Sequence, residues 1–449
     1  MPEGSGREGG VRVTSEVGGL RRALVHEPGR EVDLMVPSMM RELLFDDILL
    51  GERAREEHAL FRRVLNRLGV ETFEALDLLG EALSDAAGRE WVEARVLPHL
   101  LPEFRDRIAS MDAVALAEAL VGGIRRHPVD PACFRETLYG VRPLPNWCFQ
   151  RDTQVIVGSR VLFSSMASPA RYREAVLSEA IFRFHPRFSR VPVLSHVSPE
   201  LSFTGEPGFP GKRGQRPEVT LEGGDVLVLS DEVLVVGCSE RTSKAGVESL
   251  VRSLSRTGAG EDGAGPEVLL RVDLPRRRAY MHLDTLFTPI SGDACLVFPP
   301  VILPGHPDVA ETWEYDLRAP ETEPVPRGDL LTALRRLGLD FDPVPCGGSD
   351  PMEQRREQWT DGANALAVAP GIVVLYDRNV RTAEELARRG YAVMEAEELL
   401  SSPAGSSQGR GALDRACVLI PSGELSRARG GPRCLTHPLE RDPVPGDPP

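Results

Sequence analysis

Four stretches of the chain share one pattern, in which two short apolar runs flank a tight turn. They read RDTQVIVGSRVLFSS, GGDVLVLSDEVLVVG, LDTLFTPISGDACLVF and DGANALAVAPGIVVLY. Each predicts a β-hairpin, because aliphatic and β-branched residues favour strands while Gly, Ser, Asp and Pro favour the turn. The hairpins are introduced by Asp152, Asp225, Asp284 and Asp361, at intervals that leave room for a helix between them.

Helices are predicted where apolar residues recur every three to four positions. The pattern favours helices over residues 41–68, 243–254 and 382–389, and the last has a capping-box pattern, Thr382 with Glu385. A short strand is expected within residues 19–27, GLRRALVHE. The hairpins and this strand suggest about five similar units, and such an array removes its strand edges by closing radially. In a closed array the introducing carboxylates would share one site.

The stretch from residue 81 to 127 is helical in pattern, and no strand signal interrupts it. Leu116, Leu120 and Ile124 fall on one face of a helix. We therefore expect a helical insertion, residues 78–140, within a mixed α/β body that spans residues 15–442. Residues 1–14 are polar and glycine-rich, and we expect them to be disordered.

Composition narrows the class of protein. The chain has 449 residues, 41% hydrophobic and 27% charged, which is typical of a globular protein with a large core. A net charge of −14 argues against nucleic acid as the main partner, and no apolar run is long enough to span a membrane. Seven cysteines without framework spacing, and no secretory leader pattern, indicate a reducing, cytoplasmic location. Neither CxxC nor HExxH occurs, so we expect no structural or catalytic zinc site.

Cys434 is the candidate nucleophile. It lies in RARGGPRCLTHP, among cationic groups that are expected to lower the pKa of its thiol. Cys346, in PCGGSD, has a similar glycine-rich setting and is the alternative. His282, in YMHLDT, lies two residues before Asp284, so both would face one side of a strand and could supply an acid and base. Asp46 and Asp47, in LLFDD, fit either the edge of a pocket or a solvated turn.

Several carboxylates around one cysteine favour a cationic substrate. A guanidinium stays charged at neutral pH and presents a planar fork of donors that two carboxylates can hold. A thiol with a pKa of about 8.5 costs roughly 2 kcal/mol to ionise at pH 7. A bound positive charge nearby contributes about 4 kcal/mol, so substrate alone could generate the thiolate from a protonated resting cysteine.

The chain resembles the bacterial arginine deiminases, within the guanidine-modifying pentein superfamily. The matching stretches, in family order, are SEVGGLRRALVHEPG, LLFDD with RAREEH, NWCFQRD, SPARYREA with FRFHPRF, LEGGDVLVL with GCSERTS, YMHLDTLFT, WTDGANALAVAPG with YDRNVRT, and ELSRARGGPRCLTHPLERD. The segment CFQRD stands where relatives commonly show FTRD, and DGAN stands where DGNN is frequent. The insertion around residues 401–415 is longer than in many relatives.

The resemblance implies a five-bladed α/β propeller with an inserted helical domain. It also implies a hydrolase of C–N bonds in linear amidines, which converts L-arginine and water to L-citrulline and ammonia in arginine metabolism. Cys434 would attack the guanidinium carbon to give a covalent S-alkylthiouronium, with His282 as general acid and base. Asp152 and Asp284 would grip the guanidinium, and Glu222 in LEGGD would hydrogen-bond to it.

The resemblance further implies the residues that bind the rest of the substrate. Arg171, Arg241 and Asn146 would bind its α-carboxylate, Phe149 would pack on its aliphatic stem, and Arg429 would rearrange as substrate enters. Asp225 is expected either to be structural or to support the catalytic residues without touching substrate. The implied reaction needs no metal and no cofactor.

Other readings of the residues stay open. Another pentein guanidine hydrolase, for agmatine or a methylated arginine, is the nearest, although Arg171 and Arg241 argue for a substrate with a carboxylate. A non-catalytic arginine-binding pentein and a papain-like cysteine hydrolase are the others. Whether the chain forms a homo-oligomer is not indicated by the sequence.

Overall fold

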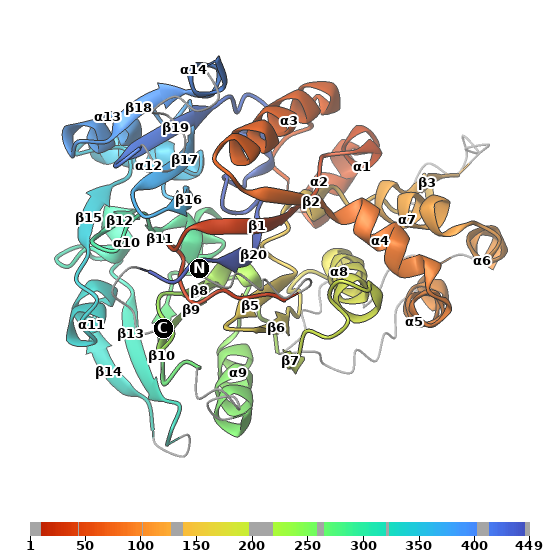
Figure 1. Ribbon diagram of the computed structural model, residues 1–449, viewed down its shortest axis with the longest axis horizontal. Coiled ribbons are helices and arrows are strands. Elements are labelled where there is room, and N and C mark those ends of the chain that lie inside the picture. The colour runs from red at the N-terminus through yellow and green to blue at the C-terminus, as the bar shows by residue number, and fades with distance from the viewer. Residues whose placement is uncertain are drawn as a thin grey trace, which may run out of the picture.

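The structure is a computed structural model that describes residues 10–43, 45–100, 102–126, 138–196, 219–257, 265–319, 323–401 and 413–444. In this part of the chain five sheets share one pairing rule (Figure 1). In each, a middle strand pairs antiparallel with one neighbour and parallel with another. The same strand arrangement therefore recurs along the chain, as the repeated sequence pattern predicts.

The five sheets follow one another along the chain with two exceptions. The first sheet uses strands from the beginning and the end of the described chain, and the third sheet takes up its last two strands after the first two strands of the fourth. The first sheet contains β20 (His437–Arg441), β1 (Leu20–Val25) and β2 (Glu71–Glu74). The second contains β5 (Gln154–Val157), β6 (Arg160–Phe163) and β7 (Val193–His196). The third contains β8 (Val226–Val228), β9 (Val233–Cys238), β10 (Val268–Asp273), β13 (Glu311–Asp316) and β14 (Val325–Gly328). The fourth contains β11 (Phe287–Pro289), β12 (Ala294–Val297) and β15 (Asp342–Pro345), and the fifth β16 (Leu366–Ala369), β17 (Ile372–Tyr376), β19 (Ala416–Ile420) and β18 (Ala392–Glu395).

All four predicted hairpins are confirmed, as β5–β6, β8–β9, β11–β12 and β16–β17. Their strands are almost completely buried on both faces, which explains why they read as continuous apolar runs. The expected first strand is β1, and the helix predicted over residues 243–254 is α9 (Lys244–Thr257).

The single helix predicted over residues 41–68 is wrong. The chain forms α2 (Pro37–Leu43) and α3 (Gly51–Arg67), separated by an irregular segment. In that segment the side chain of Asp47 accepts a hydrogen bond from the Ile48 amide, and Glu424 accepts one from the Leu50 amide. These bonds compete with helical ones, and the second depends on a residue far away in sequence.

The predicted capping box is also wrong. The helix is α13 (Val380–Arg388), and Thr382 lies inside it. Its first amides are capped from α12 (Pro351–Trp359), where the buried Glu357 carboxylate accepts bonds from the Arg381 and Thr382 amides and from the Thr382 hydroxyl. Glu385 instead pairs with Arg388 and Arg389.

A run of helices follows the first sheet, and Figure 1 shows it on one side of the molecule. It comprises α4 (Ala75–Ser84), α5 (Ala86–Val96), α6 (Pro102–Ala109) and α7 (Ala113–Gly122), with a 3₁₀ turn η1 (Leu97–His99). Leu79, Leu116 and Ile181 belong to one buried cluster, in which α4 packs against both α7 and α8 (Tyr172–Phe184) of the body. A short ribbon, β3 (Ile124–Arg125) with β4 (Tyr139–Val141), does interrupt this stretch, contrary to the uninterrupted helical pattern.

The remaining elements are short. They are the helices α1 (Arg30–Asp33), α10 (Pro299–Ile302), α11 (Leu330–Arg336) and α14 (Ala396–Ser401), and the 3₁₀ turns η2 (Pro145–Cys148), η3 (Pro169–Arg171), η4 (Gly223–Asp225), η5 (Arg278–Tyr280), η6 (Leu283–Thr285) and η7 (Leu425–Ala428).

The start of the described chain is ordered, which differs from the expectation of disorder through residue 14. The Arg12 amide donates to the Leu439 carbonyl, and Val13 exchanges two backbone hydrogen bonds with Gly158. Residues 1–9, and most of the long insertion at residues 402–412, lie outside the described residues.

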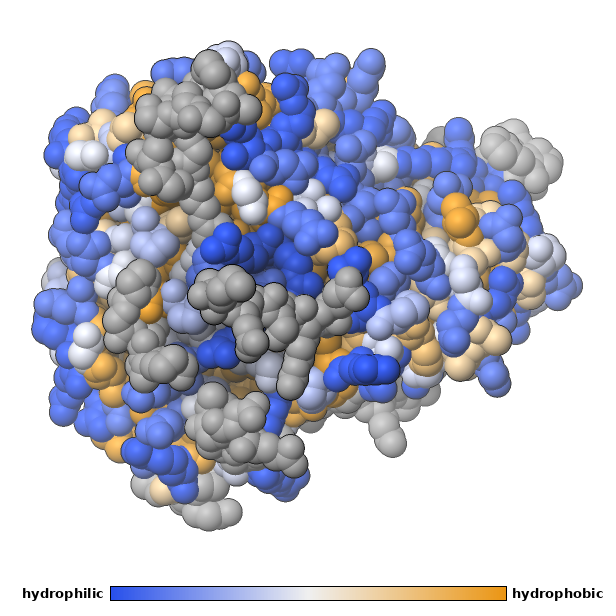
Figure 2. All heavy atoms as spheres, viewed as in Figure 1, coloured by the Kyte–Doolittle hydropathy of each residue, from blue (hydrophilic) through white to orange (hydrophobic). Residues whose placement is uncertain are grey.

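Hydrophilic residues cover most of the face in Figure 2, with hydrophobic ones scattered among them. Within the described ranges, no helix is both long and apolar enough to cross a membrane.

Candidate active site

The candidate catalytic side chains lie on short turns beside the sheets rather than on strands. Asp152 lies between η2 and β5, Glu222 precedes η4, and His282 directly precedes η6, which contains Asp284. The prediction that His282 and Asp284 share one face of a strand is therefore wrong. Cys434 lies in the loop between η7 and β20.

One small, largely enclosed pocket collects most of the predicted residues. Eight of the ten line it: Asn146, Phe149, Asp152, Arg171, Arg241, His282, Arg429 and Cys434. The other two lie directly behind it, since Glu222 contacts His282 and Asp284 contacts Cys434. The sequence reasoning missed Met281, Thr285 and Ala428, which also line the pocket. Met281 and Thr285 flank the His282–Asp284 segment and could have been found by extending that motif.

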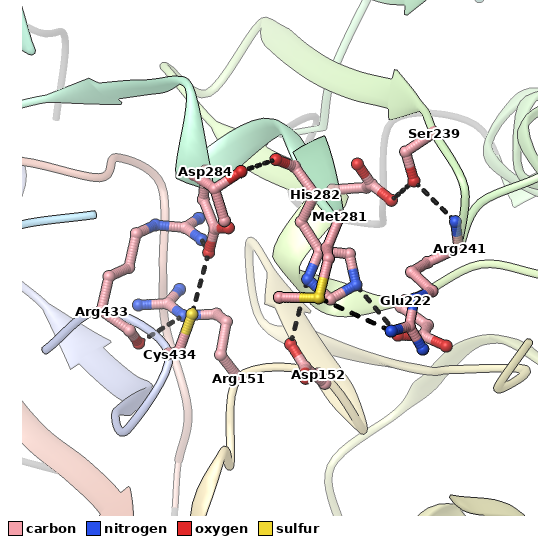
Figure 3. A network of polar contacts seen from close by, with 12 residues as sticks. Arg151, Asp152, Glu222, Ser239, Arg241, Met281, His282, Asp284, Arg433 and Cys434 are labelled. Carbon is pink, nitrogen blue, oxygen red and sulfur yellow. Dashed lines mark hydrogen bonds and ion pairs between the residues drawn. The ribbon is translucent and has the colours of Figure 1, made fainter. Parts of the chain in front are cut away.

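Cys434 is held in a buried, acidic setting. The thiol lies 3.7 Å from Oδ2 of Asp284 (Figure 3). The Cys434 amide donates to Oδ1 of Asn364. Burial raises the pKa of the thiol well above its usual value, and Asp284, Asp152 and the nearby Asp361 raise it further, against the opposing charge of Arg433. The expectation that cationic neighbours lower this pKa is wrong, and the resting cysteine is a neutral thiol.

The alternative nucleophile, Cys346, is fully buried outside this pocket. Its sulfur lies 3.7 Å from the Thr382 hydroxyl oxygen, at the start of α13, and burial raises the pKa of its thiol. The geometry therefore favours Cys434.

His282 lies between two carboxylates, as Figure 3 shows. Its Nε2 is 2.9 Å from Oε2 of Glu222, and its Nδ1 is 3.8 Å from Oδ1 of Asp152. Burial disfavours the protonated ring, but Asp152 and the hydrogen bond to Glu222 outweigh burial and raise the pKa of His282 to about 9. Gly224 leaves the space that the ring needs, because a Cβ there would lie 2.5 Å from Nδ1. His282 therefore carries a proton at neutral pH.

The two remaining carboxylates of the η4 segment have different environments. Burial raises the pKa of Glu222, but His282, Arg241 and Arg171 together lower it to about 2, so this side chain is ionised. Asp225 accepts hydrogen bonds from the Leu283 amide and the Ser239 hydroxyl. It thereby holds the turn that carries His282, which agrees with its expected structural role.

Arg171 contacts the acidic wall of the pocket. Its Nη1 lies 2.9 Å from Oδ2 of Asp152 and 3.6 Å from Oε2 of Glu222, and Glu174 holds the other edge of the guanidinium. Asp152, Glu222 and His282 bring three possible metal-ligand atoms within 4.8 Å of one another. The charge of Arg171 beside two of them, and the protonated ring of the third, suit an organic cation with N–H donors better than a metal ion.

The other expected substrate contacts surround the pocket. Arg241 donates to the sulfur of Met281, and the Asn146 side chain donates to the Leu43 carbonyl. The Phe149 ring packs against Gly430, where a Cβ would lie 2.3 Å from a ring carbon. Each group is thus fixed in part by its neighbours.

Arg429 adopts a left-handed backbone, with φ of 67°, and its guanidinium lies 3.4 Å above the centre of the Trp359 ring. Among the described residues no hydrogen-bond partner faces its three side-chain nitrogens. Asp46 lies 4.0 Å away and pairs with Arg278, while Asp47 pairs with Arg427. Asp46 therefore lies at the edge of the pocket.

The chain is similar to known proteins in both fold and sequence. The fold is shared with an amidinotransferase from Microseira wollei in saxitoxin biosynthesis, at a TM-score of 0.55 and 15% identity, covering 97% of this chain and 99% of that one. Residues 41–441 match the family model described as arginine deiminase. The chain is 33% identical to an arginine deiminase of Listeria innocua and 31% identical to one of Bacillus cytotoxicus, each over 97% of this chain and 99% of the relative. The chain belongs to the arginine deiminase family.

Proposed function

We propose that the protein hydrolyses L-arginine to L-citrulline and ammonia. The observation that carries this proposal is one pocket lined by a cysteine, a protonated histidine, Asp152 and three arginines, with the carboxylates of Glu222 and Asp284 directly behind it. The curated relatives named above are arginine deiminases, which supports the same conclusion.

The acidic wall suits the guanidinium of the substrate. Asp152 and Asp284 would hold its N–H groups from two edges, and Glu222 would accept a further hydrogen bond. The guanidinium of Arg171 lies against Asp152 and Glu222. We propose that substrate displaces Arg171 from Asp152, and that Arg171 then pairs with the substrate carboxylate.

The polar groups near Arg171 complete the site for the amino acid end. Arg241 and Asn146 would bind the α-carboxylate together with Arg171, and Phe149 would pack on the aliphatic stem. Arg429 rests on Trp359 without a hydrogen-bond partner in the described chain, so a rearrangement on substrate entry breaks no hydrogen bond.

The reaction then runs in two stages. The bound guanidinium stabilises the Cys434 thiolate, the thiol proton passes to solvent, and the thiolate attacks the guanidinium carbon. The proton of His282 passes to the departing nitrogen, ammonia leaves, and an S-alkylthiouronium remains on the sulfur. Neutral His282 next removes a proton from water, which attacks the same carbon. Collapse of that adduct expels the cysteine sulfur and gives citrulline.

The fold that supports this site is proposed to be a five-bladed α/β propeller over residues 15–442, with a helical insertion at residues 78–140. Five sheets with one pairing rule support this arrangement. A cytoplasmic location and the lack of a nucleic-acid partner stay predictions.

Turnover by the purified protein tests the proposal. We expect citrulline from arginine, none from Cys434→Ser, and little turnover of agmatine, because agmatine has no carboxylate for Arg171 and Arg241. Arginine binding without citrulline would instead support a non-catalytic binding protein, and faster turnover of agmatine or a methylated arginine would support a different guanidine hydrolase.

A further inference from the structure

A buried group of charges lies behind Cys434, and the mechanism above does not use it. It consists of Glu16, Arg151, Arg433 and Arg441, each at most 5% exposed. Arg433 donates from Nη2 to Oε1 of Glu16 at 3.0 Å and from Nε to Oε2 at 3.3 Å. Arg151 lies 3.8 Å from the same carboxylate. One carboxylate thus balances several guanidinium groups away from solvent.

Arg433 joins this group to the nucleophile. Its Nη1 lies 2.5 Å from Oδ2 of Asp284, the same oxygen that lies 3.7 Å from the Cys434 thiol. Figure 3 shows Arg433 and Arg151 beside Cys434, with Asp284 directed toward the sulfur. The charges therefore form a continuous series from Glu16 through Arg433 and Asp284 to Cys434.

The N-terminal segment fixes the start of this series. The Ser15 hydroxyl oxygen accepts hydrogen bonds from the Val17 and Gly18 amides, which closes a tight turn around Glu16. The Val228 amide also donates to Oε1 of Glu16. Burial raises the pKa of Glu16, but Arg433, Arg151 and Arg441 together lower it to about 2, so the carboxylate is charged.

We infer that Glu16 is a positioning residue that sets the electrostatic potential at Cys434 by holding Arg433 and balancing its charge. With Glu16 in place, Arg433 is shared between two carboxylates, and Asp284 keeps enough negative charge to favour a neutral thiol and a cationic substrate. Without Glu16, no second carboxylate offsets the charge of Arg433, which then acts fully on Asp284 and Cys434. Arg151 and Arg441 add further positive charge. The effect on substrate rests on the proposed function, whereas the effect on the free thiol does not.

The free thiol gives a direct readout. Asp284, Asp152, Asp361 and Arg433 are the charges that act most strongly on it, and a substitution at Glu16 replaces none of these four residues. His282, Arg171, Arg241 and Arg429 line the same pocket and are also unchanged. We expect Glu16→Gln, which keeps the shape of the side chain, to make Cys434 ionise at lower pH. The rate of Cys434 alkylation by iodoacetamide, followed by peptide mass in the absence of arginine, should rise about tenfold at neutral pH, which corresponds to about one pKa unit.

A matched control separates this effect from a general loss of stability. Glu357→Gln also neutralises a buried carboxylate, but that residue caps α13 and is not among the charges acting on Cys434. We expect it to lower the melting temperature and leave the alkylation profile unchanged. If Glu16 acts through Arg433, Glu16→Gln should also shift the profile less than half as far in an Arg433→Gln background.

Arginine turnover provides the second measurement. In Glu16→Gln the KM for arginine should rise several-fold, with a smaller change in kcat, because the site has become less negative. If the alkylation shift occurs but no variant makes citrulline, the inference stands and the proposed function fails.

An unchanged alkylation profile in folded Glu16→Gln would overturn the inference. If that variant does not fold, Glu16→Asp, which keeps the charge but draws it back from Arg433, should give a smaller shift in the same direction, and no shift would be equally contradictory.

Discussion

In the resting site Cys434 is a neutral thiol and His282 is a protonated imidazole, so neither a thiolate nor a neutral base is formed in advance. The thiol is neutral because it is buried among carboxylates, and the imidazole is protonated because Asp152 and Glu222 outweigh its burial. Bound guanidinium adds a positive charge beside the sulfur and favours the thiolate. The substrate is thus expected to activate its own nucleophile, while free protein keeps an unreactive thiol.

The pH dependence tests the state of His282. The pKa in the folded protein, about 9, lies above the usual 6.5, so the proton stabilises the fold fully below about pH 6.5 and this contribution is lost as the pH rises through about 9. Departing ammonia needs the same proton, so kcat/KM for arginine should fall above about pH 9. His185→Gln, at a histidine that pairs with Glu81 outside the pocket, should leave this alkaline limb in place. A fall in kcat/KM centred near pH 6.5 would instead contradict the raised pKa of His282.

Sequence alone predicted Cys434 as the nucleophile and a protonated resting thiol, but the expectation that cationic neighbours lower the pKa of this thiol is wrong. The motif RARGGPRC shows cationic residues near Cys434, yet it cannot show that Arg433 is already paired with Glu16 and Asp284. Those partners lie far away in the chain, and only folding brings their charges together. The types of residue near Cys434 could be predicted from the sequence, but the net effect of their charges on its thiol could not.

The elements that hold the site are turns and loops, and these were the least predictable parts of the chain. The buried hairpins follow from local patterns of apolar residues and turn residues. The break between α2 and α3 and the turn at His282 depend instead on distant partners, Glu424 and Asp225. Local patterns carry no signal for such contacts.

Glu57 shows how one such contact supports the nucleophile loop. From α3 its carboxylate accepts hydrogen bonds from the amides of Glu424 and Leu425, at the start of η7. Glu57→Ala leaves both buried amides without this partner and should lower the free energy of unfolding by about 2 to 3 kcal/mol. Urea unfolding measures this. Glu56→Ala, at the exposed neighbouring position, should change stability by less than about 0.5 kcal/mol, and an equal loss in both variants would contradict the assignment.

The two ends of the whole molecule meet in one sheet. β20 pairs antiparallel with β1, and the loop that carries Cys434 leads directly into β20. β20 therefore completes the first sheet and anchors the end of the loop that carries Cys434. The repeated pattern along the sequence predicted similar units, but gave no sign that one unit would join both ends.

Truncation tests this joining. A chain ending at Thr436 lacks β20 and leaves the buried edge of β1 without its partner. We expect it to be insoluble or unfolded by circular dichroism, with no arginine turnover. A soluble, cooperatively folding product would show that β20 is dispensable for the sheet.

The covalent step on Cys434 is the central claim, and the mass of the protein during turnover tests it most directly. Rapid acid quenching with arginine should leave part of the chain heavier by one arginine less ammonia, and peptide analysis should place the added mass on Cys434. Cys434→Ser should show neither the adduct nor citrulline. Citrulline formation by Cys434→Ser, or an adduct on another residue, would contradict the account.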